Sequence, residues 1–295
     1  PCSRPLPVRL LIADYTDSSK AKAMSLAMNA TADIPYDAVV IMDADNTAGT
    51  SFLSELNPVF QSGARAVQAH RTAKNTNTDI AVLDAASEEI NNSIFRSGHI
   101  ALGLSSALIG SGMALEACWF RQHIHLLETA GEDKEMEALL LKQRIHIEYL
   151  EHVYVKDEKT QKKEGIKNQR KRWIAAQFDS LVRALPDFPK ELLRGNIDYC
   201  DKVFQWTLLP RIILIFCTFF FTILVTLVSP YSSIKWWILA FALFLALFTA
   251  IPGHLLNKQL LRAIFQLPSL LLGIASNLFK LKGVNKKFIH TEHGN

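Results

Sequence analysis

The chain has 295 residues and a formal net charge of +4 at pH 7. A positive excess this small, dispersed along the chain, gives no indication of nucleic-acid binding. No CxxC pair and no metal-binding spacing occurs among the four cysteines, which excludes a disulfide scaffold and a zinc module and favours reduced thiols. The cysteines are Cys2, Cys118, Cys200 and Cys217.

The first 200 residues have the composition of an α/β domain. Strands and helices alternate at a pitch that predicts a mainly parallel sheet with crossover helices. Such a domain normally has more sheet before its residue 8, so we expect an N-terminally incomplete domain. The predicted strands are 8–13, 37–42, 64–70 and 147–155, and the predicted helices are 18–32, 51–60, 81–95, 113–125, 134–143 and 173–185.

A charged stretch at 156–171 is poor in apolar residues and predicts a solvated loop or a mobile lid. Beyond residue 206 the composition changes abruptly. The runs 212–228 and 236–251 are almost wholly apolar and, with their flanks, approach the ~20 residues needed to cross a bilayer. Buried core helices are the alternative, but the short turn between the runs and the flanking Trp206, Trp236 and Trp237 favour membrane spans.

The C-terminal region contains an interrupted apolar segment, 262–279, followed by a lysine cluster. Because Lys and Arg favour the cytoplasmic side, a segment lying along the inner membrane surface is preferred here to a third span. The sequence thus predicts four parts: a cytoplasmic catalytic domain (1–185), an interfacial connector (186–205), two transmembrane helices (206–253), and an interfacial or re-entrant helix with a basic cytoplasmic tail (254–295).

Asp43 and Asp45 directly follow the strand predicted at 37–42. Ligands of open α/β sheets bind at the carboxyl ends of strands. Mg²⁺ or Mn²⁺ takes one or two carboxylates together with substrate phosphate oxygens, and such an ion neutralises a departing diphosphate. The alternative is an acidic turn in which Asn46 and Thr47 cap the next helix.

Glu132 and Asp133 follow Gly131 at the start of a predicted helix. They are either simple N-terminal residues stabilised by the helix dipole or general-base machinery that removes a proton from an acceptor hydroxyl. Asp133 is the better candidate for the base, with Glu132 as a supporting partner.

Gln169, Arg172 and Trp173 belong to the sequence QRKRW, which combines planar donors, positive charge and an aromatic face. Arg can clamp a pyrophosphate and Trp can stack on a sugar ring. The alternative is a basic helix start that binds lipid head groups at a membrane surface.

Gly110, Ser111 and Gly112 form a glycine-rich tripeptide. It permits close approach of the backbone to a ligand, although such a tripeptide alone is more often a turn.

In their order along the chain, these segments resemble the motifs of the family 2 glycosyltransferases, the inverting, membrane-attached class that includes cellulose and hyaluronan synthases. The resemblance extends from about Lys20 to the C-terminus, with Gly131 where Thr is usual. The sequence departs from the family in two further respects: most of the first βα unit is not seen upstream, and the spans are fewer than those that surround the channel of polymer-extruding synthases. The resemblance implies a GT-A-type nucleotide-binding fold. It also implies roles for the site residues. Donor and diphosphate binding would fall to Lys22, Asp43, Asp45, Gln169, Arg172 and Trp173, and metal binding to Asp43 and Asp45. Acceptor binding would fall to Gly110, Ser111, Gly112 and Trp173, and catalysis to Asp133 with Glu132.

The function that the resemblance implies is transfer of a sugar from a UDP-sugar, with Mg²⁺ or Mn²⁺, to a polysaccharide or glycolipid acceptor. We expect a multi-pass protein of the inner or plasma membrane, in contact with membrane lipids and with a co-polymerase or export partner. The alternative is a membrane-tethered binding or scaffold protein whose transferase-like domain is inactive. A transporter is a poorer interpretation, since the apolar runs hold almost no ionisable residues.

Overall fold

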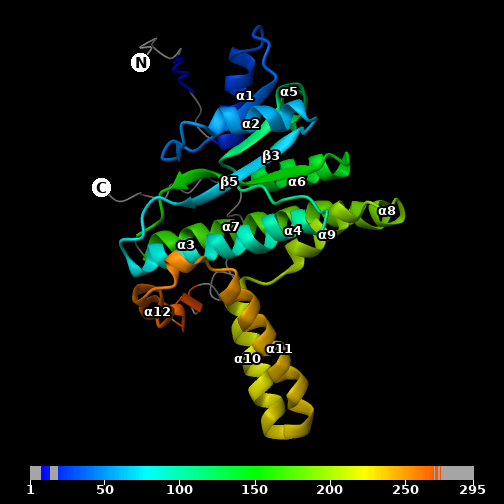
Figure 1. Ribbon diagram of the computed structural model, residues 1–295. Helices are drawn as coiled ribbons and strands as arrows, with labels where there is room; N and C mark the ends of the chain where they lie inside the picture. The colour runs from blue at the N-terminus through cyan, green and yellow to red at the C-terminus, as the bar shows by residue number, and fades with distance from the viewer. Residues whose placement is uncertain are drawn as a thin grey trace.

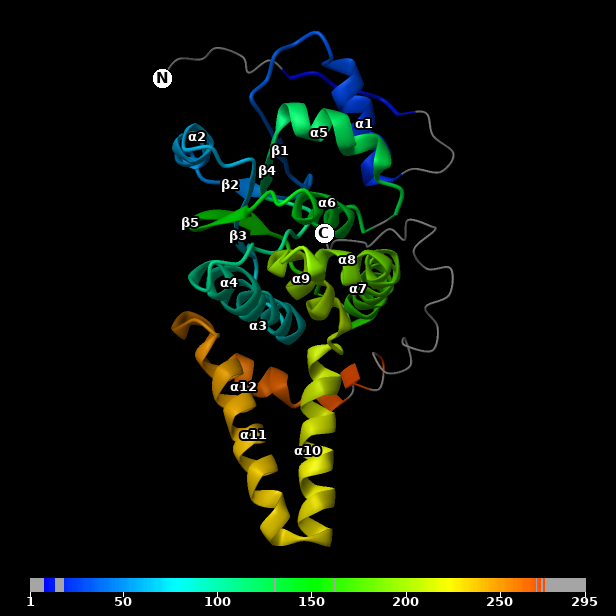
Figure 2. The same ribbon diagram turned by 90° about the vertical axis from the view of Figure 1, so that its right-hand side faces the viewer.

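The computed structural model describes residues 8–13, 19–129, 131–161 and 163–268, together with residues 270, 271 and 273. A β-sheet forms the middle of the molecule, helices cover both of its faces, and a pair of long helices projects away from this layered body (Figures 1 and 2). The predicted α/β architecture with two apolar helices after it is thus present in the described part of the chain.

The sheet has the strand order β1-β4-β3-β5-β2. Strands β1, β3 and β5 run in one direction, and β3 pairs with β5 in parallel, whereas β4 and β2 run in the opposite direction. The sheet is therefore mixed. The strands are β1 (Ala38–Ile41), β2 (Thr47–Ala48), β3 (Ala66–Ala73), β4 (Met113–Glu116) and β5 (Ile147–Asp157).

The expectation of a mainly parallel sheet was wrong because of two strands that were not predicted, β2 and above all β4. A single helix was predicted over 113–125, but Met113–Glu116 forms a strand that inserts between β1 and β3 and pairs antiparallel with both. Only the remainder of the segment is helical. The four β4 residues are apolar apart from Glu116, so a short apolar run next to a helix gave no periodicity that separates strand from helix.

Helices α1, α2 and α5 lie on one side of the sheet, and α3, α4, α7, α8 and α9 lie on the other, toward the projecting pair (Figure 2). Ser19 begins α1, because its Oγ accepts a hydrogen bond from the backbone N–H of Lys22. These helices and α6 are α1 (Lys20–Ala30), α2 (Phe52–Gln61), α3 (Asp79–Asn92), α4 (Gly98–Ala101), α5 (Ala117–His123), α6 (Glu132–Lys142), α7 (Lys163–Ala184), α8 (Phe188–Leu193) and α9 (Ile197–Thr207). One π-helical turn covers Ser93–Ser97, and 3-10 turns cover Ile124–Leu126, Leu185–Asp187 and Gly253–Leu255.

One strand prediction and one loop prediction were wrong. Residues 8–13, predicted as a strand, lie outside the sheet. The stretch 156–171, predicted as a loop or lid, is largely ordered structure, because β5 extends to Asp157 and α7 begins at Lys163. Contacts made by α7 with neighbouring helices stabilise its first half, which is poor in apolar residues.

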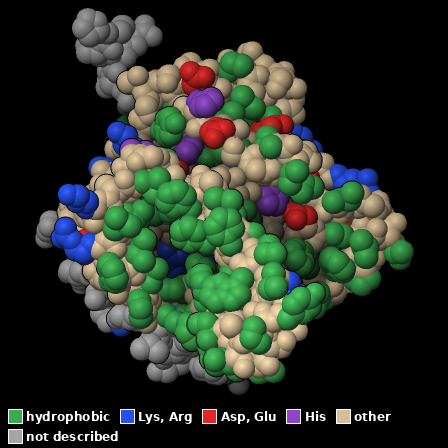
Figure 3. Space-filling view, turned by 60° about the horizontal axis from the view of Figure 1, so that its bottom comes forward, with side chains coloured by type: hydrophobic (Ala, Val, Ile, Leu, Met, Phe, Trp, Pro, Cys, Tyr) green, Lys and Arg blue, Asp and Glu red, His purple; other side chains and the backbone are tan. Residues whose placement is uncertain are grey.

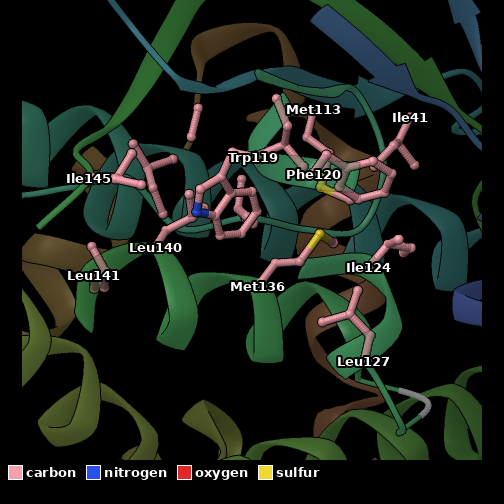
Figure 4. Packing of buried hydrophobic residues seen from close by; sticks show 14 of the residues in the cluster. Ile41, Met113, Trp119, Phe120, Ile124, Leu127, Met136, Leu140, Leu141 and Ile145 are labelled. Atoms are coloured by element: carbon pink, nitrogen blue, oxygen red, sulfur yellow. The ribbon is translucent and has the colours of Figure 1, made fainter. Parts of the chain in front are cut away.

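The main hydrophobic core lies between α5, α6 and β4 and continues to α9. Figure 4 shows Trp119 and Phe120 of α5 packed over Met136 and Leu140 of α6. Residues 186–205 were expected to form an interfacial connector. Helix α9 instead adds two residues of this region to the same core, together with Trp206, which was expected at a membrane interface. These residues are Tyr199, Val203 and Trp206.

The projecting pair consists of α10 (Arg211–Val228) and α11 (Pro230–Thr249), and in the described residues these two helices are long and apolar enough to cross a membrane. Small side chains lie between them. Thr222 of α10 and Ser233 and Ala240 of α11 are buried there, a composition that permits close helix approach in lipid. Hydrophobic side chains gather over this end of the molecule (Figure 3).

After α11 the chain turns back toward the body. Helix α12 (Lys258–Ile264) packs on α3, where Leu260 lies in a cluster with Val82 and Ala86. Part of the predicted interfacial segment 262–279 and the whole basic tail after it lie outside the described residues.

Candidate active site

The turn after β1 holds the first pair of predicted carboxylates. The backbone N–H of Asp43 donates to Ser111 Oγ (3.2 Å) and to Asn46 Oδ1 (3.4 Å), and the Asn46 N–H donates back to the Asp43 carbonyl oxygen (3.1 Å). The Asn46 amide also donates to Asp45 Oδ1 (3.2 Å). Asn46 therefore fixes the turn that presents both aspartates, which differs from the helix-capping role considered for it above.

The Gly110–Gly112 tripeptide lies directly beside this turn. Gly110 has φ +78° and Gly112 has φ +64°, conformations that favour glycine. A Cβ on Gly112 would also lie 3.1 Å from Val155 Cγ2. Ser111 between them is fully buried, and its hydroxyl is bonded to the Asp43–Asn46 turn. The tripeptide thus supports the acidic turn, and acceptor binding by these residues stays a prediction.

Glu132 and Asp133 begin α6 on the other side of Gly110. A Cβ built on Gly110 would lie 3.7 Å from Glu132 Oε1 and 3.9 Å from Asp133 Cβ. These are ordinary contact distances, so the backbone of Gly110 lies directly against the two acidic side chains. The predicted residues Asp43, Gly110, Glu132 and Asp133, distant in sequence, lie together.

The side chain of Lys20, in the first turn of α1, joins the two halves of the site. Its Nζ forms an ion pair with Asp43 Oδ1 and donates a hydrogen bond of 2.6 Å to the Gly110 carbonyl oxygen. The same nitrogen lies 3.9 Å from Glu132 Oε1. Lys20 was not among the predicted site residues. Lys22, which was, is exposed on α1.

Glu132 is only 8% exposed. Burial, and then the adjacent negative charge of Asp133, raise the pKa of Glu132 to about 7, against the opposing effect of Lys20. A carboxyl group with such a pKa changes its protonation state near neutral pH, as acid–base residues of enzymes commonly do.

A buried network of four charges lies beneath the acidic turn. Arg71 Nε donates to Glu88 Oε1 (2.6 Å), and Lys159 Nζ pairs with both Glu88 and Asp157, at 2.9 Å from Asp157 Oδ2. Asp157 Oδ1 in turn accepts from Asn46 Nδ2 (3.0 Å). The network therefore anchors the Asn46 side chain and, through it, the turn that carries Asp43.

The QRKRW segment lies inside α7. Arg170 Nη2 donates to Asp84 Oδ1 (2.9 Å) and Ser87 Oγ (3.1 Å), and its guanidinium lies 5.0 Å from the centre of the Trp173 ring. Arg170 thus ties α7 to α3. Gln169 Oε1 is buried and has no hydrogen-bond partner among the residues that the structure describes.

Helix α7 approaches the start of α6, where Glu132 and Asp133 lie, through Ala176, which lies one turn after Trp173 on the same face. A Cβ on Gly131 would lie 2.8 Å from Ala176 Cβ, closer than packing permits. Gly131 is thus required where related motifs have Thr, because α7 packs directly against the residue that precedes Glu132. Donor binding by Gln169, Arg172 and Trp173 stays a prediction.

The residues that could hold a divalent cation are the two aspartates of the turn. Their oxygen donors have the chemistry that Mg²⁺ or Mn²⁺ prefers, and a substrate diphosphate would complete the coordination shell. Among the described residues, no group of three His, Cys, Asp or Glu side chains could hold a metal by itself. The donor set thus fits a cation that arrives with its phosphate ligand and does not fit a permanent metal cage.

Residues 38–249 match the family model described as glycosyl transferase family group 2. The match spans more than half of the chain, so the chain belongs to this family and is a glycosyltransferase that requires a sugar donor and an acceptor. No significant match was found among curated proteins.

Sequence reasoning missed Lys20, Asn46 and the buried Arg71–Glu88–Asp157–Lys159 network. Two of these had a local signal: Lys20 precedes Lys22 in the same motif, and Asn46 directly follows the acidic pair. The network had none, because its members come from β3, α3, the end of β5 and the loop after it.

Proposed function

We propose that this protein is an inverting glycosyltransferase that moves a sugar from a UDP-sugar to a polysaccharide or glycolipid acceptor at the inner face of a membrane. The observation that carries the proposal is the approach of Asp43, Gly110 and Glu132 to a single lysine Nζ. A cation-binding carboxylate and a proton-accepting one must lie on either side of the reacting sugar, and these groups come from separate segments of the chain.

In this mechanism Asp133 takes the proton of the acceptor hydroxyl. The acceptor oxygen forms a bond to the anomeric carbon while the bond from that carbon to the diphosphate oxygen breaks, and UDP departs with the bonding electron pair. Attack opposite the leaving group inverts the anomeric configuration. Mg²⁺ or Mn²⁺ bound through Asp43 and Asp45 supplies neutralisation of the diphosphate charge.

The roles of the other residues follow from their positions. Glu132 stands beside Asp133 and, with a pKa raised to about 7 by burial, limits the negative charge at the base. Arg172 and Trp173 would hold the diphosphate and the acceptor sugar from α7. Lys22 would contact the donor from the exposed face of α1.

Membrane attachment through α10 and α11 is part of the proposal. Only 11% of the most apolar window of each helix is buried inside the molecule, so most of this apolar surface needs a cover other than the protein itself. A bilayer provides one, and two spans leave the catalytic domain and the end of α11 on the same side. Lipids, and a co-polymerase or export protein, are the partners expected there.

The decisive experiment measures UDP release from a panel of UDP-sugars by the purified full chain, with Mg²⁺, Mn²⁺ or EDTA. We expect metal-dependent release with at least one donor and a product of inverted anomeric configuration by NMR. Absence of release with every donor would instead favour the scaffold interpretation.

Two variants test the assigned roles. Asp133→Asn should lower turnover about 10³-fold, the range of general-base catalysis, with UDP affinity near that of the wild type. Asp45→Asn should weaken UDP binding only when the metal is present. Asp187→Asn, which removes an exposed carboxylate paired with Lys142, is the matched control and should keep full activity. Equal losses of turnover and UDP affinity in Asp133→Asn would contradict its role.

A further inference from the structure

Lys20 occupies a position between the two carboxylate groups of the site. Its Nζ pairs with Asp43 Oδ1, donates to the Gly110 carbonyl oxygen at 2.6 Å and lies 3.9 Å from Glu132 Oε1. The side chain retains 25% of its exposure and that of Asp43 retains 40%, so both groups are reachable from solvent. An ammonium group is therefore bound where the proposed function requires a divalent cation.

We infer that Lys20 is an internal cation that competes with the divalent metal for Asp43, and that it makes the site bind the metal–nucleotide complex in preference to the bare metal. The inference rests on the proposed function, because it takes Asp43 as a metal ligand. A metal bound at the carboxylate and an ammonium in direct contact with it repel each other. Metal binding thus requires Lys20 to leave Asp43.

The displaced ammonium has other partners close by. The Gly110 carbonyl oxygen lies 2.6 Å and Glu132 Oε1 lies 3.9 Å from Lys20 Nζ, so both are within reach of the ammonium group when it leaves Asp43. A diphosphate arriving with the metal adds negative charge next to this lysine. A bare metal ion brings no such partner, so its binding carries the full cost of breaking the Lys20–Asp43 ion pair.

The test compares Mn²⁺ binding, measured by electron paramagnetic resonance of free Mn²⁺, in EDTA-stripped full-length protein with and without UDP. In Lys20→Met the affinity for Mn²⁺ alone should rise about fivefold, the value of a partly exposed ion pair. Because the variant also loses the attraction for diphosphate, UDP should enhance Mn²⁺ binding less than in the wild type. Lys20→Arg keeps the charge and should resemble the wild type.

Lys142→Met is the matched control, because it removes an exposed lysine that pairs with Asp187 outside the site, and it should leave Mn²⁺ affinity unchanged. The increase seen in Lys20→Met should disappear in an Asp43→Asn background. If Lys20→Met does not fold, Lys20→Gln serves in its place, since it also removes the charge.

The outcomes separate the two hypotheses. If Asp45→Asn weakens Mn²⁺ binding but Lys20→Met leaves it unchanged or weakens it, Lys20 does not compete with the metal. The proposed metal site then stands. If neither aspartate variant affects Mn²⁺ binding, with or without UDP, the metal site of the proposed function is itself wrong.

Discussion

Two glutamates of this protein have the same exposure and opposite ionisation behaviour. Glu88 and Glu132 are each 8% exposed. Burial raises the pKa of both, but the charges of Arg71 and Lys159 lower the pKa of Glu88 to about 2, whereas that of Glu132 rises to about 7. Burial alone therefore does not decide the state of a carboxylate, and the number of cations in contact with it does.

The surroundings of Glu88 and Glu132 differ in structural role as well as in net charge. Around Glu88, two cations and two carboxylates form a balanced network under the sheet edge. Around Glu132, a second carboxylate is adjacent and Lys20 lies 3.9 Å away. The balanced cluster holds the acidic turn in place, and the unbalanced one keeps a proton-exchanging group next to the proposed base.

The largest loss of stability should come from breaking the charge balance around Glu88. Glu88→Gln leaves Arg71 and Lys159 buried with one carboxylate between them, and removal of one partner from a buried ion network costs about 3 kcal/mol or more. The free energy of unfolding of the full chain, measured by denaturant titration at pH 7, should fall by this amount. A loss below about 1 kcal/mol would contradict the importance assigned to the network.

In contrast to Glu88→Gln, the substitution Glu132→Gln is expected to increase the free energy of unfolding. Since the folded-state pKa of Glu132 lies above its ordinary value of 4.5, the folded protein binds more protons than the unfolded one between pH 4.5 and 7, and stability falls as the pH rises through that window. Glutamine does not titrate. The stability of the variant should therefore exceed that of the wild type by about 3 kcal/mol at pH 8 and match it near pH 4.5. A difference independent of pH would show that the carboxyl group titrates normally.

A third substitution tests whether the packing of α7 keeps the start of α6, with Glu132, buried. Gly131→Ala places a Cβ 2.8 Å from Ala176 Cβ and should cost about 1.5 kcal/mol, as overpacking typically does. In an Ala176→Gly background, which removes the opposing methyl group, the cost of Gly131→Ala should be smaller. Purely additive effects of the two substitutions would exclude direct contact between these positions.

The smallest effect serves as the baseline for the comparison. The Lys142–Asp187 pair has exposed side chains, 44% and 34% by fraction. Asp187→Asn should change the free energy of unfolding by less than about 1 kcal/mol, because water screens exposed ion pairs. A loss comparable to that of Glu88→Gln would remove the distinction between buried and exposed pairs in this protein.

The sequence by itself determined the features that are local in the chain. Acidic pairs after an apolar strand and at a helix start, and two long apolar runs, are visible without coordinates, because each depends on neighbouring residues and their periodicity. The α/β class followed from the alternation of such segments, and the motif order led to the family.

Tertiary structure alone decided the features that depend on residues distant in the chain. Met113–Glu116 became a strand because β1 and β3 lie on either side of it, and α7 is a long helix because α3 and α6 pack against it. Lys20 lies between Asp43 and Glu132 through contacts across 23 and 112 positions in sequence. The lowered pKa of Glu88 arises from Arg71 and Lys159, which are 17 and 71 positions away. Coulomb interactions depend on separation in space, which folding sets and sequence proximity does not reveal.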